Sequence, residues 1–151
     1  MDKPVQRGSQ RINEHLLEYW SSKKSGRLFP TEGDIDPEEI ADIWTSCFLV
    51  RTDEAGRTKY QYTYLGDALI DAYGDDLTNQ DICNKLVNPN SMSLVHKFDD
   101  VCQHKQPVEE ESEFTNSNGM LIKFRSCMVP LGKDNSNDVA FILGGMKWKA
   151  F

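Results

Sequence analysis

The 151-residue sequence predicts an α+β fold, with an antiparallel sheet flanked by short helices and an N-terminal helix capping the sheet. Three observations predict this class. Two strand-like segments separated by a turn come early, short helical patterns follow, and a run of three strand-like segments closes the chain. We expect residues 1–8 to form a flexible lead-in and residues 9–151 to form one domain, since a chain of this length is usually one domain.

The first element is a helix expected from Ser9 to about Lys24, with Ser9 able to cap its first turn. Its apolar residues recur at helical spacing and form one stripe, made of Ile12, Leu16, Leu17 and Trp20. The stripe either caps the helix's own sheet or meets a second subunit, and the sequence leaves both open. We therefore take these four residues as interface candidates and expect a homodimer.

The next elements are a helix start and a β-hairpin. Asp36 followed by Pro37 is a strong start signal, because the carboxylate can accept from free amides and proline has no amide to lose. Residues 47–51 and 60–65 then read as paired strands around a turn at residues 53–56. Strict alternation would place the side chains of Tyr60, Tyr62 and Tyr64 on one face.

Two helices are expected between the hairpin and the final strands. Leu69, Ile70 and Tyr73 indicate a short helix that ends at Gly74. A longer helix is expected to start at Ser91, and its apolar face is formed by Leu94, Val95, Phe98, Val101 and Cys102.

The three final strands are expected at residues 107–114, 120–131 and 139–148. The last is apolar on both faces, which indicates cover on both sides of the sheet. Within it, Gly144 and Gly145 would let another segment pack closely on the strand. Only three residues follow, so we expect the chain to carry no output domain and to act through a partner.

Composition limits the partners and the compartment. A formal net charge of −7 disfavours nucleic acid and anionic membrane surfaces as partners. No segment approaches the roughly 18 apolar residues of a membrane helix, and the N-terminus lacks the apolar core of a signal peptide. The four cysteines are scattered, as expected for reduced thiols, so a cytoplasmic location is predicted.

No catalytic set or metal motif is recognisable. The acidic pairs Asp75-Asp76 and Asp99-Asp100 are adjacent in sequence, and neighbours on a helix do not share a face. The cysteine spacings contain no CxxC metal motif, and no serine lies in a nucleophile elbow. We therefore predict a protein that is not an enzyme.

Six runs of the sequence match a known family, at residues 16–20, 26–30, 34–40, 48–50, 62–66 and 74–78. Through these runs the sequence resembles a family of compact single-domain PAS-like proteins best known from alphaproteobacteria. The order of hairpin, helices and antiparallel strands is similar to that of PAS-type sensor domains. A glycine commonly follows the Leu-Thr pair in the family, whereas this chain has Asn79. The resemblance implies a PAS-type fold and a signalling role, but supplies no catalytic or ligand residues.

The resemblance implies where a ligand would bind. PAS cavities lie between the inner face of the sheet and the short helices. The large apolar residues expected there are ligand-pocket candidates, with a filled core as the alternative: Phe48, Tyr64, Leu69, Tyr73, Phe98, Phe124 and Phe141.

Two cofactors known from PAS domains are disfavoured by the sequence. A haem would need a histidine on the helix before the final strands, where His96 and His104 read as surface or rim residues. A flavin photosensor carries an Asn-Cys-Arg-Phe-Leu-Gln motif, of which only the cysteine, Cys83, is matched here. The cofactor, if there is one, stays unknown.

The function predicted is therefore a non-enzymatic signalling or regulatory PAS-like sensor or adaptor. It would act through a protein partner, and gating by a small-molecule ligand is left open. The alternative is a small-molecule-binding or enzymatic α+β cone fold with a deep pocket.

Overall fold

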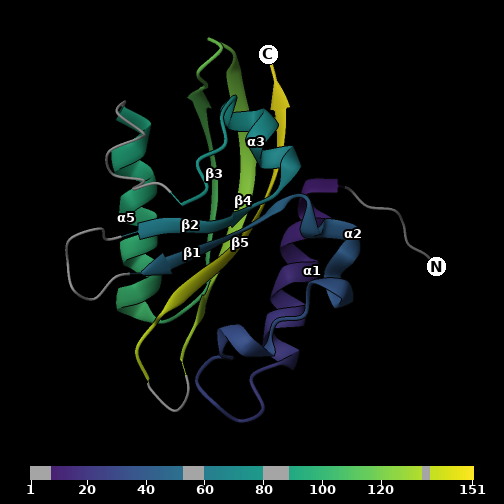
Figure 1. Cartoon of the computed structure of the whole chain (residues 1–151), viewed down its shortest axis with the longest axis vertical. Helices are drawn as coiled ribbons and strands as arrows, with labels where there is room; N and C mark the ends of the chain where they lie inside the picture. Colours follow the sequence, from purple (N-terminus) through teal and green to yellow (C-terminus); the bar gives the residue numbers. More distant parts are fainter. Residues whose placement is uncertain (1–7, 53–59, 80–88, 134–136) are drawn as a thin grey trace.

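The computed structural model describes residues 8–52, 60–79, 89–133 and 137–151 and shows a five-stranded antiparallel sheet (Figure 1). The order is β2-β1-β5-β4-β3, so the last strand in sequence lies at the centre and pairs with the first. All neighbouring strands are antiparallel, which confirms the predicted fold class. The strands are β1 (Cys47–Thr52), β2 (Tyr60–Leu65), β3 (Val108–Thr115), β4 (Leu121–Leu131) and β5 (Phe141–Ala150).

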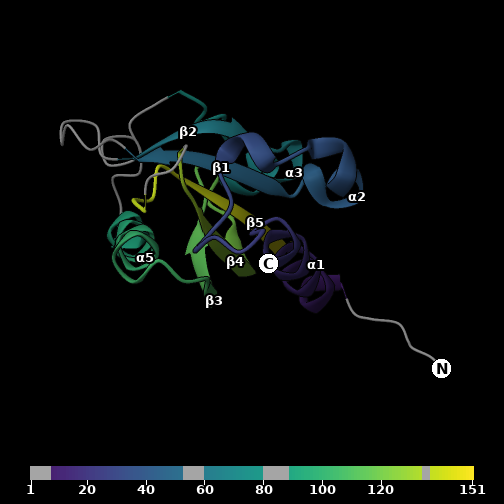
Figure 2. The same ribbon diagram turned by 90° about the horizontal axis from the view of Figure 1, so that it is seen from below.

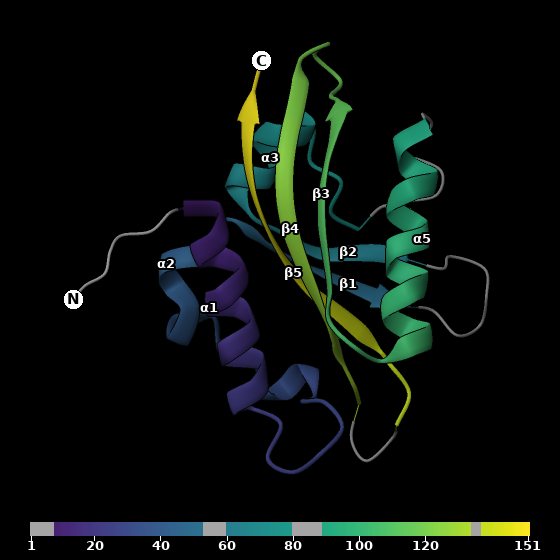
Figure 3. The ribbon, with the colours of Figure 1, turned by 180° about the vertical axis from the view of Figure 1, so that it is seen from behind.

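Helices flank the sheet on two sides (Figure 2). On the outer face, α1 (Gly8–Ser22) packs against β4 and β5 (Figure 3). The opposite, inner face meets α3 (Asp67–Tyr73) and α5 (Pro89–His104). The predicted cover on both faces of the last strand is thus confirmed. In the described part of the chain, no helix is both long and apolar enough to cross a membrane.

The apolar stripe of α1 is buried on the helix's own sheet. Ile12, Leu16 and Trp20 are 4%, 0% and 7% exposed, and Leu17 is half-buried. The indole N–H of Trp20 donates to the carbonyl of Pro130 in β4 at 2.8 Å. The helix therefore caps its own sheet in this structure, because β4 and β5 supply the apolar surface that the stripe needs. A role of these residues in a subunit interface stays a prediction.

A short helical connection links α1 to the sheet. Asp36 accepts from the amide of Glu38 at 3.0 Å and Pro37 begins the 3-10 turn η2 (Pro37–Ile40), which confirms the predicted start. It follows the turn η1 (Glu32–Asp34) and leads into α2 (Ala41–Trp44). Tyr19 of α1 holds this connection, because its hydroxyl donates to Glu39 at 2.7 Å and accepts from the Asp36 amide at 2.8 Å.

A β-bulge changes the faces of the tyrosines in β2. Leu49 of β1 pairs with Tyr64 and Val50 pairs with Tyr62, so Thr63 is an extra residue in β2. Tyr62 therefore faces inward, whereas Tyr64 turns outward and stacks on Trp44 at a ring-centroid distance of 4.4 Å. The expectation that the three tyrosines share one face was wrong, because a bulge inverts the alternation beyond it.

Two residues after α3 have positive φ. Gly74 ends the helix at φ 79°, as predicted, and Asn79, further along the chain, adopts φ 64°. Asparagine is the residue type that tolerates this left-handed region best after glycine. This explains why asparagine replaces the glycine that the resemblance led us to expect at this position.

Candidate functional site

The centre of the inner face is filled by aromatic rings. Phe48 of β1 lies against Tyr62 of β2 at a ring-centroid distance of 5.6 Å and against Phe98 of α5 at 6.2 Å. A β-carbon added to Gly144 would lie 2.1 Å from Cζ of Phe48, so the ring occupies the space where another side chain would stand. We call Phe48, Tyr62, Phe98 and Gly144 the ring cluster. It is a packed core in this part of the structure.

A second aromatic group continues from the ring cluster. The hydroxyls of Tyr62 and Tyr73 share a hydrogen bond of 3.1 Å. The ring of Tyr73 then stacks on Phe114 at 5.3 Å, and Phe114 lies 5.8 Å from Phe124. Burial raises the pKa of Tyr62 well above its ordinary value and raises that of Tyr73 as well. Both hydroxyls are thus neutral and able to donate or accept hydrogen bonds.

A third tyrosine ties the edge of the sheet to α5. The hydroxyl of Tyr60 donates to the carboxylate of Asp99 and lies 3.9 Å from the sulfur of Cys102. Burial, together with the hydrogen bond to Asp99, raises the pKa of Tyr60. This contact anchors α5 over the inner face.

Two polar side chains face each other across β3 and β4. Glu110 and Ser126 are directly opposite in the register. The Ser126 hydroxyl is buried and makes no hydrogen bond to the described residues. Burial raises the pKa of the Glu110 carboxyl, although the positive charge of Lys97 acts in the other direction. A buried hydroxyl without a partner is uncommon and marks a place where a ligand could supply the missing bond.

Methionines enclose that serine. Met146 of β5 is its partner in the register, and Met128 lies two residues further along the same face of β4. They are 3% and 2% exposed. Methionine side chains rearrange readily because they are unbranched. A ligand could therefore reach Ser126 only by displacing packed side chains.

The structure divides the seven predicted pocket residues between the two faces of the sheet. Phe48 and Phe98 belong to the ring cluster, Tyr73 and Phe124 to the second aromatic group, and Leu69 is buried on α3. Tyr64 and Phe141 lie on the outer face. Tyr64 lies there because of the bulge in β2. Phe141 lies there because it is four residues from Gly145, which faces α1, and alternate residues of a strand share a face. These two cannot line an inner-face pocket.

Three residues of this site were not among the predicted pocket residues. Tyr62 was expected only as a strand residue, and neither Glu110 nor Ser126 was among the seven pocket candidates. The signal that would have found the pair is the register across the turn between β3 and β4, which sets Glu110 beside Ser126.

Metal and cofactor candidates gain no support from geometry. Within the described ranges, no three His, Cys, Asp or Glu side chains are close enough to hold a metal ion. His96 and His104 are exposed on α5 and so are not placed to ligate a group held against the inner face. Cys83, the flavin candidate, lies outside the described residues.

Solved structures of PAS and LOV domains resemble the chain in fold. A PAS domain of a Colwellia psychrerythraea protein matches with TM-score 0.53 and 15% identity, covering 73% of this chain and 92% of that one. The LOV domain of the Erythrobacter litoralis EL346 blue-light activated histidine kinase gives 0.51 and 15%, covering 70% and 96%. The PAS domain of the fruit-fly ELK potassium channel gives 0.50 and 18%, covering 75% and 96%. Such low identities show the fold alone.

The family is identified from the amino-acid sequence rather than from the fold. No curated protein matches the chain. The PAS domain family, in contrast, matches residues 9–147, nearly the whole sequence. This confirms the PAS part of the predicted resemblance and does not favour the cone-fold alternative, while an alphaproteobacterial distribution stays a prediction. The chain belongs to the PAS domain family.

Proposed function

We propose that this chain is a non-enzymatic sensor or adaptor that acts through a protein partner, with its state set at the inner face of the sheet. PAS domains are signalling sensor modules in many proteins and are typically not enzymes. The buried tyrosine hydroxyls agree with this role, because their raised pKa values favour hydrogen-bonding neutral forms.

The observation that carries the proposal is the pair Gly144 and Gly145 in β5. Gly144 lies under the ring of Phe48 on the inner face. A β-carbon on Gly145 would lie 3.2 Å from Cδ1 of Ile12 and 3.5 Å from Cδ2 of Leu16, so α1 rests on the outer face at the same point. Displacement of Phe48 would therefore shift the strand on which α1 packs. Packed groups transmit such shifts because they cannot compress.

Ser126 offers a second connection between the faces. Its hydroxyl points inward and has no hydrogen-bond partner among the described residues, and its carbonyl accepts from the side-chain amide of Asn13 in α1 at 3.4 Å. The same amide donates to Glu109 at 2.9 Å. A small ligand that bonds the Ser126 hydroxyl would thus act on a strand that α1 also contacts.

Native mass spectrometry of the freshly purified protein, beside a denaturing run, tests the ligand. We expect extra mass that disappears on denaturation, and less of it in Ser126→Ala, which removes the hydroxyl without adding volume. Ser112→Ala, at an exposed residue of β3, is the matched control and should keep the ligand. Equal ligand occupancy in both variants would argue against ligand gating. So would a protein that shows no extra mass and is not stabilised by any added small molecule.

The homodimer and the cytoplasmic location remain parts of this proposal. Because the stripe of α1 is buried in this structure, a dimer of this conformation has to use other surface, and sedimentation of the full chain measures whether it forms. The cytoplasm is in line with the free thiols of Cys47 and Cys127.

A further inference from the structure

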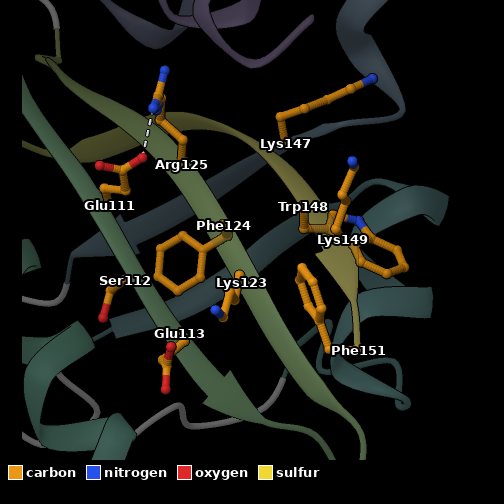
Figure 4. Close-up of a pocket in the computed structure, with 10 residues that line it drawn as sticks. All are labelled: Glu111, Ser112, Glu113, Lys123, Phe124, Arg125, Lys147, Trp148, Lys149 and Phe151. Carbon is orange, nitrogen blue, oxygen red and sulfur yellow. Dashed lines mark hydrogen bonds and ion pairs between the residues drawn. The ribbon is translucent and has the colours of Figure 1, made fainter.

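The outer face carries a cluster of cations beyond the stretch that α1 covers (Figures 3 and 4). Lys123 and Arg125 of β4 stand directly opposite Lys149 and Lys147 of β5 in the register. Like charges in directly opposed positions destabilise a sheet. Two such pairs in succession are therefore a feature that folding alone does not favour.

The fold pairs only part of this cluster with carboxylates. Arg125 forms an ion pair of 2.5 Å with Glu111 of β3. Glu113 of β3 stands opposite Lys123 in the register, and the ammonium of Lys123 lies 4.9 Å from the ring centroid of Phe151. Lys147 and Lys149 make neither a hydrogen bond nor an ion pair with the described residues, and both are exposed. We call Lys123, Arg125, Lys147 and Lys149 the basic cluster.

The basic cluster borders a shallow concavity with a volume of about 650 Å³ (Figure 4). Its lining contains four cations and two carboxylates, Glu111 and Glu113, so this face is positive although the chain has a formal net charge of −7. Phe151 also lines the concavity and is 67% exposed, one of the few large apolar side chains in the described chain that are exposed.

We propose that this concavity docks an acidic segment of a partner protein, with its carboxylates on the basic cluster and an apolar side chain against Phe151. This rests on the proposed function, which assigns the output to a protein partner. A second copy of the same face is disfavoured, because two positive surfaces would meet. Nucleic acid is disfavoured by the negative charge of the rest of the chain.

Selection of random dodecapeptides displayed on phage against the full chain tests the proposal. We expect the wild type to enrich peptides that combine Asp or Glu with Leu or an aromatic residue. The double variant Lys147→Glu/Lys149→Glu should lose them. Lys105→Glu/Lys133→Glu makes the same charge change just after the ends of α5 and β4, away from the basic cluster, and should keep them.

One enriched peptide, labelled with fluorescein, then gives affinities by anisotropy. We expect binding to weaken about tenfold or more in Lys147→Glu/Lys149→Glu and to fall with added salt, as for charge-steered contacts. Phe151→Ala should weaken binding while leaving the salt dependence unchanged. Both variants should remain folded, because the first replaces like-charge pairs by opposite ones and the second changes an exposed side chain.

Three results would overturn this inference. Peptides that bind equally to the wild type and the double variant would leave the protein partner in place but move it to another surface. Absence of enrichment, or equally tight binding of polyglutamate or a single-stranded oligonucleotide, would show that no specific acidic segment is recognised. Dimerisation that Lys147→Glu/Lys149→Glu abolishes would assign the face to a second copy.

Discussion

Substituting alanine for each of the two adjacent glycines of β5 should change the free energy of unfolding by different amounts, because the two residues face opposite sides of the sheet. A β-carbon at Gly144 would lie 2.1, 2.4 and 2.7 Å from three ring atoms of Phe48, whose side chain is 3% exposed. A β-carbon at Gly145 meets only the flexible ends of Ile12 and Leu16, at 3.2 to 3.5 Å. Gly144→Ala therefore has to move a buried ring, whereas Gly145→Ala has to move a methyl group by tenths of an ångström.

The magnitudes follow from overpacking and chain entropy. Overpacking a core costs about 1–3 kcal/mol, and three contacts this short indicate the upper end for Gly144→Ala. Replacing a strand glycine by alanine returns roughly 0.5–1 kcal/mol of backbone entropy. We therefore expect Gly144→Ala to lower the free energy of unfolding by about 2 kcal/mol, and Gly145→Ala to change it by less than about 0.5 kcal/mol.

Urea unfolding followed by the fluorescence of the three tryptophans measures both values. A double-mutant cycle identifies the cause. Phe48→Ala alone should cost about 3–5 kcal/mol, and in that background Gly144→Ala should become neutral or stabilising because the clash is gone. Equal effects of the two alanines, or a Gly144→Ala cost that persists without the ring, would refute the close packing described for β5.

Three further predictions concern a backbone position and two ionisable groups. Asn79→Gly should be tolerated, whereas Asn79→Ala should lose about 1 kcal/mol in urea unfolding because of the positive φ; equal stabilities would contradict that conformation. The pKa of Tyr19 is raised to about 12, mainly by burial, so its contribution to stability is present below pH 10 and is lost as the pH rises toward 12. Tyr19→Phe should flatten that loss, and an unchanged pH profile would count against the contact with Glu39. Burial raises the pKa of Glu110, so Glu110→Gln should stabilise the fold at pH 7 and the gain should vanish once the carboxyl is protonated in acid; a loss of stability at pH 7 would oppose this assignment.

Much of the fold could be predicted because local patterns determine it. The alternation of apolar residues located all five strands, with boundaries shifted by no more than two residues. Asp36 with Pro37 and the glycine at position 74 marked helix ends through their backbone chemistry alone. The longer helix α5 begins at Pro89 rather than at Ser91, since proline is also favoured in a first helical turn.

The candidate site was harder to predict because it depends on register and on three-dimensional packing. Nothing local marks Thr63 as a bulge residue, so Tyr64 was assigned to the wrong face. The importance of Ser126 comes from the lack of a hydrogen-bond partner for its hydroxyl in the part of the chain that the structure describes, which a sequence cannot show. Whether the stripe of α1 caps its own sheet or pairs subunits depended on the glycine beneath it, and Gly145 was recognised only as a position of close packing.

Hydrogen exchange of α1 tests the coupling between the two faces of the sheet most directly. Gly144→Ala disturbs the inner face through Phe48 without touching α1. Val101→Ala, at a buried residue of α5, is the control. The two variants are compared at equal global stability, which is adjusted with urea. If the faces are coupled, amides of residues 12–22 exchange faster in Gly144→Ala than in the control, because the strand beneath Ile12 and Leu16 has shifted. Identical exchange of α1 in the two variants would contradict the account, since a change at the inner face would then not reach the outer one.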